Sequence, residues 1–236
     1  MIQIQQLTKR FGHFTAVDHL SFEVRTGEVL GFLGPNGAGK STTMKMLTGF
    51  LEPDEGDIQI LGEDLRKNPL AVKRNIGYLP EGAPAYSDLT PKQFLTFIAQ
   101  MRGFRGAEIK RRVEEVVEKI NLSSVYHQSI ETLSKGFKRR VGLAQAILHD
   151  PKILILDEPT DGLDPNQKYE VRQLISAMSK DKIIILSTHI LEEVDAVCTR
   201  AMIIANGKLV VDSSPQALAE QGPLDQVFRR LTTQCN

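Results

Sequence analysis

The sequence has little of what marks secreted, disulfide-stapled or nucleic-acid-binding proteins. Its 236 residues include two cysteines, Cys198 and Cys235, far apart in the chain. They form neither a C-x-x-C motif nor a disulfide framework, which is typical of a reducing compartment and predicts two inert thiols. Lysine plus arginine and aspartate plus glutamate number 29 each, so the formal net charge is zero. Because a dedicated nucleic-acid binder usually has a basic excess, this balance disfavours that class.

Long apolar runs are also absent. No stretch approaches 18 consecutive apolar residues, and residues 1–4 lack the basic and apolar regions that open a signal peptide. We therefore expect no segment of this sequence to span a membrane, and any membrane role to come through a partner. The composition, with 41% hydrophobic and 25% charged residues, is typical of a globular protein and excludes disorder, collagen and coiled coil as the main state.

Short apolar, β-rich segments recur before residue 80 and after residue 150. They are residues 2–7, 20–24, 29–33, 58–60, 76–79, 153–156 and 183–186. The last two are continuous rather than alternating, as are strands that a parallel sheet buries on both faces. Asn206-Gly207 lies between two further apolar segments and predicts a two-residue hairpin. The pattern indicates an α/β fold.

The middle of the chain has a helical period instead, beginning at the helix start Thr90-Pro91. Three apolar stripes are expected to be core faces. They are Phe94, Phe97, Ile98 and Met101; Ile109, Val113, Val116, Val117 and Ile120; and Phe137, Val141, Ala144 and Leu148. We therefore predict an α/β core formed by residues 1–89 and 151–222, a helical subdomain at 90–150, and a C-terminal tail at 223–236.

Residues 34–41, Gly-Pro-Asn-Gly-Ala-Gly-Lys-Ser, fit the phosphate-binding P-loop pattern G-x-x-x-x-G-K-S/T. Glycines let backbone N–H groups curl around phosphate oxygens, and the helix that follows adds its dipole. Lys40 is then the point charge on the β- and γ-phosphates, and Ser41 offers a hydroxyl to Mg²⁺. The residues expected to hold the nucleotide are Gly34, Pro35, Asn36, Gly37, Ala38, Gly39, Lys40, Ser41 and Thr42.

The apolar strand 153–156 ends in two carboxylates, Asp157 and Glu158. The carboxyl ends of strands are where α/β sheets place their ligands. Taken alone, the pair fits a buried strand ending in a solvated acidic turn equally well. Beside a P-loop, we interpret Asp157 as the carboxylate that holds Mg²⁺, mainly through water, and Glu158 as the base that accepts a proton from the attacking water.

With these two motifs the chain resembles the ATP-binding cassette family, and the resemblance covers nearly the whole sequence. Residues 133–137, Leu-Ser-Lys-Gly-Phe, are similar to the family's signature motif, and 161–164, Asp-Gly-Leu-Asp, to its D-loop. His189 is similar to its switch histidine, and Phe11 to the aromatic that stacks on adenine. The resemblance implies a P-loop NTPase core with a mainly parallel sheet, antiparallel N-terminal strands and a helical insert. It also implies that the chain binds and hydrolyses MgATP, and that His189 contacts the γ-phosphate of the bound ATP.

In this family the signature motif faces ATP bound to the other subunit. The resemblance therefore implies that Ser134, Gly136 and Asp164 complete a composite site in a homodimer, or a paired cassette, that closes head-to-tail on ATP. Ser134 is also suited to capping the helix it opens. A transmembrane permease subunit is the implied partner, with the chain peripheral on the cytoplasmic face of the cell membrane and no nucleic acid bound.

Two departures from the family pattern stand out. Where the family has glutamine after the strand that ends near Leu79, this chain has Glu81. That glutamine touches Mg²⁺ and the attacking water, so the resemblance implies a metal-binding and catalytic role for Glu81, with an added charge. Lys135 and Phe137 replace glycine and glutamine in the signature. Both departures resemble the sequences of the exporter-type branch of this family, and the tail sequence at 227–232 does so too.

Other functions fit less well. A non-transport cassette ATPase of the translation type usually has two cassettes in one chain, and one of the DNA-repair type has long coiled-coil inserts. A GTP-binding module would need the guanine-reading N-K-x-D motif, which is absent. The basic clusters 110–112 and 138–140 are interpreted as solvated helix faces rather than a nucleic-acid site, because the net charge is zero and glutamates surround the first.

Overall fold

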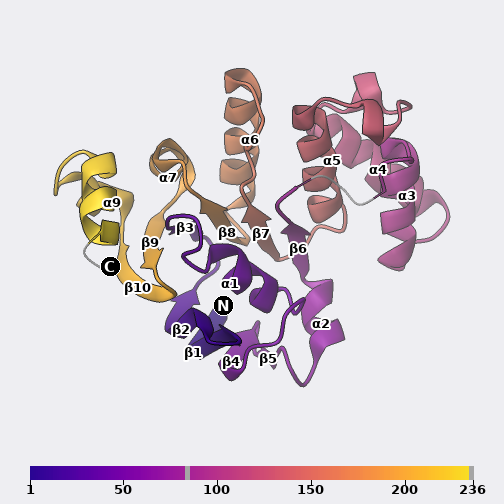
Figure 1. The fold of residues 1–236 in the computed structure, drawn as a ribbon. Helices are drawn as coiled ribbons and strands as arrows, with labels where there is room; N and C mark the ends of the chain where they lie inside the picture. Colours follow the sequence, from indigo (N-terminus) through magenta and orange to yellow (C-terminus); the bar gives the residue numbers. More distant parts are fainter. Residues whose placement is uncertain (83–85, 234–236) are drawn as a thin grey trace.

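The structure, a computed structural model, describes residues 1–82 and 86–233. Within those residues the strands form two sheets (Figure 1). The first has the order β2-β1-β4-β5 and comprises β1 (Ile2–Phe11), β2 (Phe14–Val24), β4 (Glu55–Ile60) and β5 (Glu63–Asp64). The second has the order β10-β9-β3-β8-β7-β6 and comprises β3 (Val29–Leu33), β6 (Ile76–Leu79), β7 (Ile153–Asp157), β8 (Ile183–Thr188), β9 (Arg200–Ala205) and β10 (Lys208–Ser213).

The helices connect and cover these sheets. They are α1 (Lys40–Leu47), α2 (Pro69–Arg74), α3 (Pro91–Met101), α4 (Ala107–Lys119), α5 (Lys135–Ile147), α6 (Pro165–Met178), α7 (Leu191–Val197), α8 (Pro215–Ala219) and α9 (Leu224–Thr233). Two 3-10 turns, Ser123–Val125 and Ile130–Thr132, lead from α4 to α5. None of the helices in the described part of the chain has the length and apolar character needed to cross a lipid bilayer.

The second sheet confirms the prediction of a parallel, doubly covered core. Strands β6, β7, β8, β3 and β9 pair in parallel, and every residue of β3, β7 and β8 is buried. β10 pairs antiparallel with β9 through the predicted hairpin. Its turn residues Asn206 and Gly207 have φ of 49° and 77°, the left-handed conformation that a two-residue hairpin requires.

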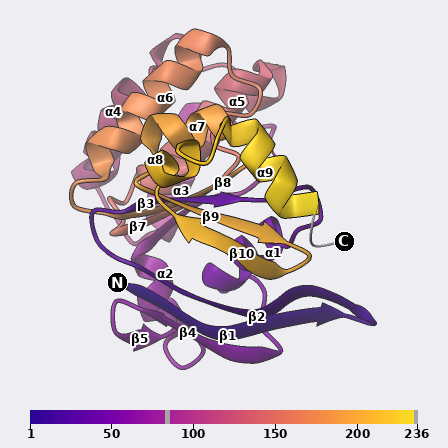
Figure 2. The same cartoon turned by 90° about the vertical axis from the view of Figure 1, so that its left-hand side faces the viewer.

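Alternate residues of these strands pack into two different hydrophobic clusters. Leu30 and Phe32 of β3 face a cluster that includes Met44 and Leu47 of α1 and the inward side of the first sheet, so α1 lies between the two sheets (Figure 2). Val29 and Leu33 of β3 face the other cluster, which takes in α3–α9. Because the side-chain period of a strand is two, continuous apolar strands can supply both clusters at once.

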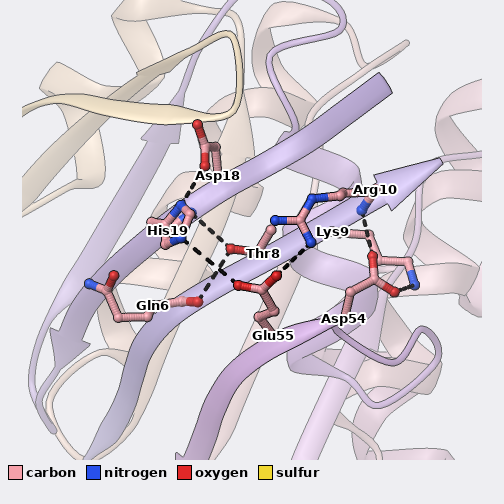
Figure 3. Close-up of polar contacts among 8 residues, drawn as sticks. All are labelled: Gln6, Thr8, Lys9, Arg10, Asp18, His19, Asp54 and Glu55. Carbon is pink, nitrogen blue, oxygen red and sulfur yellow. Dashed lines mark hydrogen bonds and ion pairs between the residues drawn. The ribbon is translucent and has the colours of Figure 1, made fainter. Parts of the chain in front are cut away.

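A polar network ties the strands of the first sheet together (Figure 3). Asp54 accepts hydrogen bonds from Lys9 Nζ at 2.9 Å and from the Arg10 backbone N–H at 2.6 Å. Glu55 pairs with Arg10 at 2.6 Å, and His19 N–H donates to Thr8 Oγ1 at 3.1 Å. Such exposed pairs add little stability each. Together they fix the register of β1, β2 and β4 beside the β1–β2 turn.

The helical segment begins where the sequence predicts. Thr90 and Gln93 form a capping box at the start of α3, with Gln93 N–H donating to Thr90 Oγ1 at 3.2 Å. The second and third apolar stripes lie in the core or against it. The first stripe is partly wrong: Met101 is 70% exposed, and Leu95 and Ala99 are buried instead. Met101 ends α3 and lines a surface groove, so its turn of the helix lies beyond the core.

The interpretation of the two basic clusters is half right. Residues 110–112 form a solvated face, where Arg111 pairs with Glu115 at 2.7 Å and Arg112 with Glu108 at 3.0 Å. In the second cluster, however, Arg139 is 5% exposed and Arg140 is 6% exposed. Both guanidinium groups find carbonyl acceptors inside the protein, which is why burying them is tolerated.

Cys198 is buried, and burial raises the pKa of its thiol, as expected for an inert cysteine. Cys235, with the end of the predicted tail at 234–236, lies outside the described residues.

Candidate functional site

The phosphate-binding motif forms the turn between β3 and α1. Gly39 caps α1 with φ of 102°, and a Cβ added there would lie 2.3 Å from the Ala16 carbonyl oxygen. A Cβ added to Gly34 would lie 2.5 Å from the Ile204 carbonyl oxygen. Glycine is therefore required at both positions by the backbone of neighbouring strands as well as by the ligand the loop is suited to hold.

Lys40 is the first residue of α1, and its ammonium group folds back over the loop. Nζ donates to the carbonyl oxygens of Gly34 at 2.7 Å and Pro35 at 3.1 Å. Burial lowers the pKa of Lys40, and the carboxylates of Glu158, Asp157 and Glu81 oppose that effect. The site thus has a cation in the P-loop and three carboxylates near enough to influence its charge.

A cavity of about 390 Å³ opens over the loop. It is lined by Phe11, Phe14, Ala16, Asn36, Gly37, Gly39, Lys40, Ser41, Thr42, Glu81 and Glu158. The structure thus brings predicted residues from four separate segments to one place. Gly34, Pro35 and Ala38 belong to the same loop but do not line the cavity.

Phe14 and Ala16 also line the cavity, and sequence reasoning missed both. Phe11 and Phe14 are partners across the β1–β2 hairpin, at its turn. Both residues are largely solvent-exposed: Phe11 is 50% exposed and Phe14 is 59% exposed. Exposed aromatic side chains beside an anion-binding loop offer a surface on which a planar ring can stack. The signal that could have found Phe14 is the spacing of two aromatics around Gly12-His13.

The end of β7 places the two predicted carboxylates. Asp157 is buried and accepts a hydrogen bond from the Ser187 hydroxyl of β8. Glu158 has φ of 52°, and its backbone N–H donates to the Ser187 carbonyl at 2.9 Å. A non-glycine residue in this conformation is strained, and such strain gathers where a side chain must point in one direction. Here Glu158 lines the cavity of the P-loop.

His189 follows β8, the neighbour of β7. Its Nδ1 lies 2.9 Å from Glu158 Oε1, while more than half of its side chain stays exposed. The structure therefore brings together a carboxylate that could act as a base and an imidazole that could orient it. Neighbouring Thr188 donates to the buried Glu193 carboxylate at 2.7 Å, and burial raises the pKa of Glu193.

Asp157 and His189 adjoin Glu158 but do not themselves line the cavity. Three further predicted residues lie at the starts of α5 and α6. Ser134 caps α5 by accepting from Phe137 N–H at 3.3 Å, and Asp164 caps α6 by accepting from Gln167 N–H at 2.9 Å. Gly136 is packed so tightly that a Cβ would lie 2.6 Å from Gln167 Oε1. The described lining of the cavity includes none of them. In one chain, these residues lie apart from the P-loop.

Glu81 and Glu158 form a wall that two cavities share. The second cavity, of about 120 Å³, is lined by Glu81, Gly82, Lys135, Lys138, Arg139, Glu158 and Asp161. Lys135, one of the departures from the signature pattern, pairs there with Asp161 at 2.8 Å. The hydrogen bond from Lys135 lowers the pKa of Asp161.

The donor set suits a hard cation held jointly with a ligand. Within residues 1–82 and 86–233, no group of three or more histidine, cysteine, aspartate or glutamate side chains gathers into a self-sufficient metal site. The Ser41 hydroxyl, the Asp157 carboxylate and the Glu81 carboxylate supply oxygen alone. Mg²⁺ prefers such oxygens and usually completes its shell with water and substrate phosphates.

Comparison with known proteins agrees with this geometry. Residues 17–161 match the family described as ABC transporter. The uncharacterized ABC transporter ATP-binding protein YxlF of Bacillus subtilis is 39% identical over 94% of this chain and 73% of its own length. The bacitracin transport ATP-binding protein BcrA of Bacillus licheniformis is 38% identical over 98% of this chain and 72% of its own length. The probable multidrug ABC transporter ATP-binding protein YbhF of Escherichia coli is 37% identical over 96% of this chain, which spans 39% of that protein.

Solved structures have the same fold. The structure of an ATP-binding subunit of an ABC transporter superposes with a TM-score of 0.89 at 30% identity, covering 98% of this chain and 99% of the other. A dimeric ATP-binding cassette in a post-hydrolysis state, bound to ADP and Pi, superposes with a TM-score of 0.85 at 21% identity, covering 91% of this chain and 99% of the other.

Proposed function

The chain belongs to the ABC transporter family as an ATP-binding, ATP-hydrolysing cassette, and from this premise we propose that it powers an exporter whose membrane-spanning part is a separate permease subunit. The observation that supports this best is the single cavity in which the P-loop, Glu81 and Glu158 meet. Relatives named for bacitracin transport, multidrug transport and Nod factor export favour the export direction. Because these relatives are named as transport or export proteins, they do not favour the non-transport alternative.

The phosphates of ATP are proposed to lie in the loop formed by residues 34–42. Lys40 then exchanges its bonds to the Gly34 and Pro35 carbonyls for phosphate oxygens, at little cost because the ammonium is already held over the loop. The adenine ring stacks on Phe11, with Phe14 beside it. Ser41, Asp157 and Glu81 are proposed to hold Mg²⁺, which when bound neutralises charge on the phosphates.

Glu158 is proposed as the general base for hydrolysis. Its backbone N–H donates to the Ser187 carbonyl at 2.9 Å, which holds this residue at the edge of the P-loop cavity, where its carboxylate would accept a proton from the attacking water. His189, 2.9 Å from that carboxylate, orients it and is placed to contact the γ-phosphate. Both residues follow the ends of adjacent strands, β7 and β8, whose pairing sets their separation.

The residues outside the cavity are proposed to serve a second chain. Ser134 and Gly136 open α5, and the N–H groups at the start of a helix attract anions. Asp164 opens α6 nearby, where Gln167 contacts the Gly136 position. A head-to-tail homodimer, or a paired cassette, would place these groups on the γ-phosphate of ATP bound to the partner.

A groove of about 620 Å³ is proposed to receive the permease subunit. Phe50, Leu70 and Met101 are exposed apolar side chains that line it, from the segment after α1, from α2 and from α3. Ile76 and Tyr78 of β6 form its floor, and β6 leads directly to Glu81. The groove lies where the proposed core, 1–89 and 151–222, meets the proposed helical subdomain, 90–150 (Figure 1). Of the proposed tail, 223–236, the helix α9 lies at the opposite edge of the second sheet, beside β9 and β10. We place the chain peripherally on the cytoplasmic face of the cell membrane.

The test is recovery of the partner together with activity. The tagged chain, isolated from detergent-solubilised membranes of the cells that make it, should bring with it a protein with several membrane spans. Phe50→Asp with Met101→Asp should abolish that association and leave ATP hydrolysis by the isolated chain unchanged. Association with ribosomes or DNA-repair proteins, and absence from the membrane fraction, would overturn the proposal in favour of the non-transport class.

A further inference from the structure

Arg139 is a buried cation that the proposed hydrolysis does not use. It lies in the second turn of α5, is 5% exposed, and follows the half-buried Lys138. Burying a guanidinium group is costly unless hydrogen bonds and opposite charges compensate. The partners that compensate for Arg139 therefore indicate what the side chain does.

Those partners are the backbone carbonyls that flank two proposed catalytic residues. Nη1 of Arg139 donates to the carbonyl oxygens of Pro80 at 2.6 Å and Gly82 at 3.2 Å, on either side of Glu81. Nη2 donates to the carbonyl oxygen of Asp157, directly before Glu158. One planar group thus joins the loop after β6 to the end of β7.

The chemistry of the guanidinium group suits this position. Its donors have a fixed angular arrangement, so acceptors on two segments are held at a fixed orientation to each other. Hydrogen bonds from a charged donor are about twice as strong as those between neutral groups. Burial lowers the pKa of Arg139, and the carboxylates of Asp157, Asp161, Glu158 and Glu81 oppose that effect.

Arg139 reaches these segments from outside the nucleotide cavity. It lines the smaller cavity on the other side of the wall formed by Glu81 and Glu158, and does not line the cavity of the P-loop. It therefore acts through those two residues rather than on the nucleotide.

We propose that Arg139 is a positioning residue for ATP hydrolysis, which fixes the loop of Glu81 against the strand end of Glu158 so that both carboxylates face the P-loop. The inference rests on the proposed role of Glu158. Since α5 begins beside Ser134, the same helix holds the proposed second-chain contact and the arginine.

Arg140 is the matched control. It is 6% exposed on the same helix, and it donates to the Ile120 carbonyl at 3.3 Å and to Glu170 Oε2 at 2.9 Å. These partners lie after α4 and on α6. Arg139→Lys and Arg140→Lys thus make the same chemical change at two buried positions, of which one contacts the Glu81 loop.

The experiment measures steady-state ATP hydrolysis, thermal unfolding and amide hydrogen exchange on the full chain. Arg139→Lys should lower kcat about tenfold or more while KM for ATP stays within about threefold, since phosphate binding by the P-loop is untouched. The backbone amides of residues 81–82 and 157–158 should exchange faster. Arg140→Lys should lose comparable thermal stability and keep kcat and those amides near the wild-type values.

Wild-type kcat in folded Arg139→Lys overturns the inference, as does an equal loss of kcat in both variants. If Arg139→Lys does not fold, Arg139→Gln, which keeps a donor without a buried charge, is measured in its place by the same criteria. If the wild-type chain binds ATP but does not hydrolyse it, the proposed function fails. Hydrogen exchange still shows in that case whether Arg139 fixes the loop.

Discussion

Lys135 and Asp161 form an ion pair of 2.8 Å that joins the start of α5 to the turn after β7. The Lys135 side chain lies along Gly162: a Cβ added to Gly162 would be 2.6 Å from Cδ of Lys135. Both charged side chains are largely exposed, so the pair contributes little to the stability of the fold. Its consequence is local: Lys135 links the start of α5 to the turn that contains Asp161.

Replacing this lysine should therefore have a small, pH-dependent effect. Lys135→Ala should lower the free energy of unfolding by less than about 1 kcal/mol at pH 7. Lys135 holds the pKa of Asp161 below its usual value. The contribution is thus present above the unfolded-state pKa of aspartate and is lost as the pH falls through the lowered folded-state pKa. Urea unfolding of both proteins from pH 7 downward measures the difference, which should shrink in acid. A difference that grows in acid would contradict the assignment.

Lys40→Ala should abolish ATP hydrolysis without unfolding the chain. The substitution removes the cation that the P-loop holds toward the phosphates, while Gly34 and Pro35 keep their backbone positions. Steady-state phosphate release and a thermal melt measure the two effects. Lys45→Ala, at an exposed position on the same helix, is the control and should hydrolyse ATP normally. Near-normal turnover in folded Lys40→Ala would mean that the phosphates lie elsewhere.

Much of this site could be predicted because its residues are close in sequence. The P-loop is one turn between a strand and a helix, and Asp157-Glu158 ends a continuous apolar strand. Each motif contains its own structural context, so the local pattern is sufficient. The buried runs 153–156 and 183–186 likewise predict parallel strands, and β7 and β8 pair in parallel.

What could not be predicted depends on contacts between distant segments. Arg139 is one of three adjacent basic residues, and its burial depends on carbonyls that lie 57 and 59 residues away in the chain. Phe14 reaches the cavity only because the β1–β2 turn places it opposite Phe11. Met101 has the right spacing for a core stripe, but α3 ends there, at the edge of the groove. Neither composition nor periodicity contains these relationships.

Phe11 and Phe14 should both contribute to ATP binding. Stacking of a base on an aromatic ring is worth about 1–3 kcal/mol, so Phe11→Ala and Phe14→Ala should each raise KM for ATP about tenfold, with kcat within about twofold. Phe50→Ala is the control, because Phe50 is an exposed phenylalanine in the groove away from the P-loop. An unchanged KM in Phe14→Ala, beside a raised KM in Phe11→Ala, would leave Phe11 as the sole platform.

The last prediction concerns Glu158 and the assembly of two chains. Glu158→Gln should bind MgATP and barely hydrolyse it, because an amide keeps the shape and the neighbour His189 but cannot accept the proton. ATP then persists between Lys40 of one chain and Ser134 of the other. A ligand that bridges the dimer shifts the equilibrium toward it by mass action. Size-exclusion chromatography with light scattering should therefore show twice the mass of one chain with ATP, and one chain with ADP.

A second substitution separates the composite site from other routes to association. Glu158→Gln with Ser134→Arg should stay monomeric in ATP, since the new side chain occupies the place of the partner's γ-phosphate. Glu158→Gln with Ser176→Arg should still dimerise, because exposed Ser176 lies about 18 Å further along α6 from Asp164. Wild-type hydrolysis by Glu158→Gln would place the base elsewhere. If Glu158→Gln traps ATP but remains a single chain at high concentration, with the permease subunit present, the head-to-tail site is wrong and Ser134 is only the cap of α5.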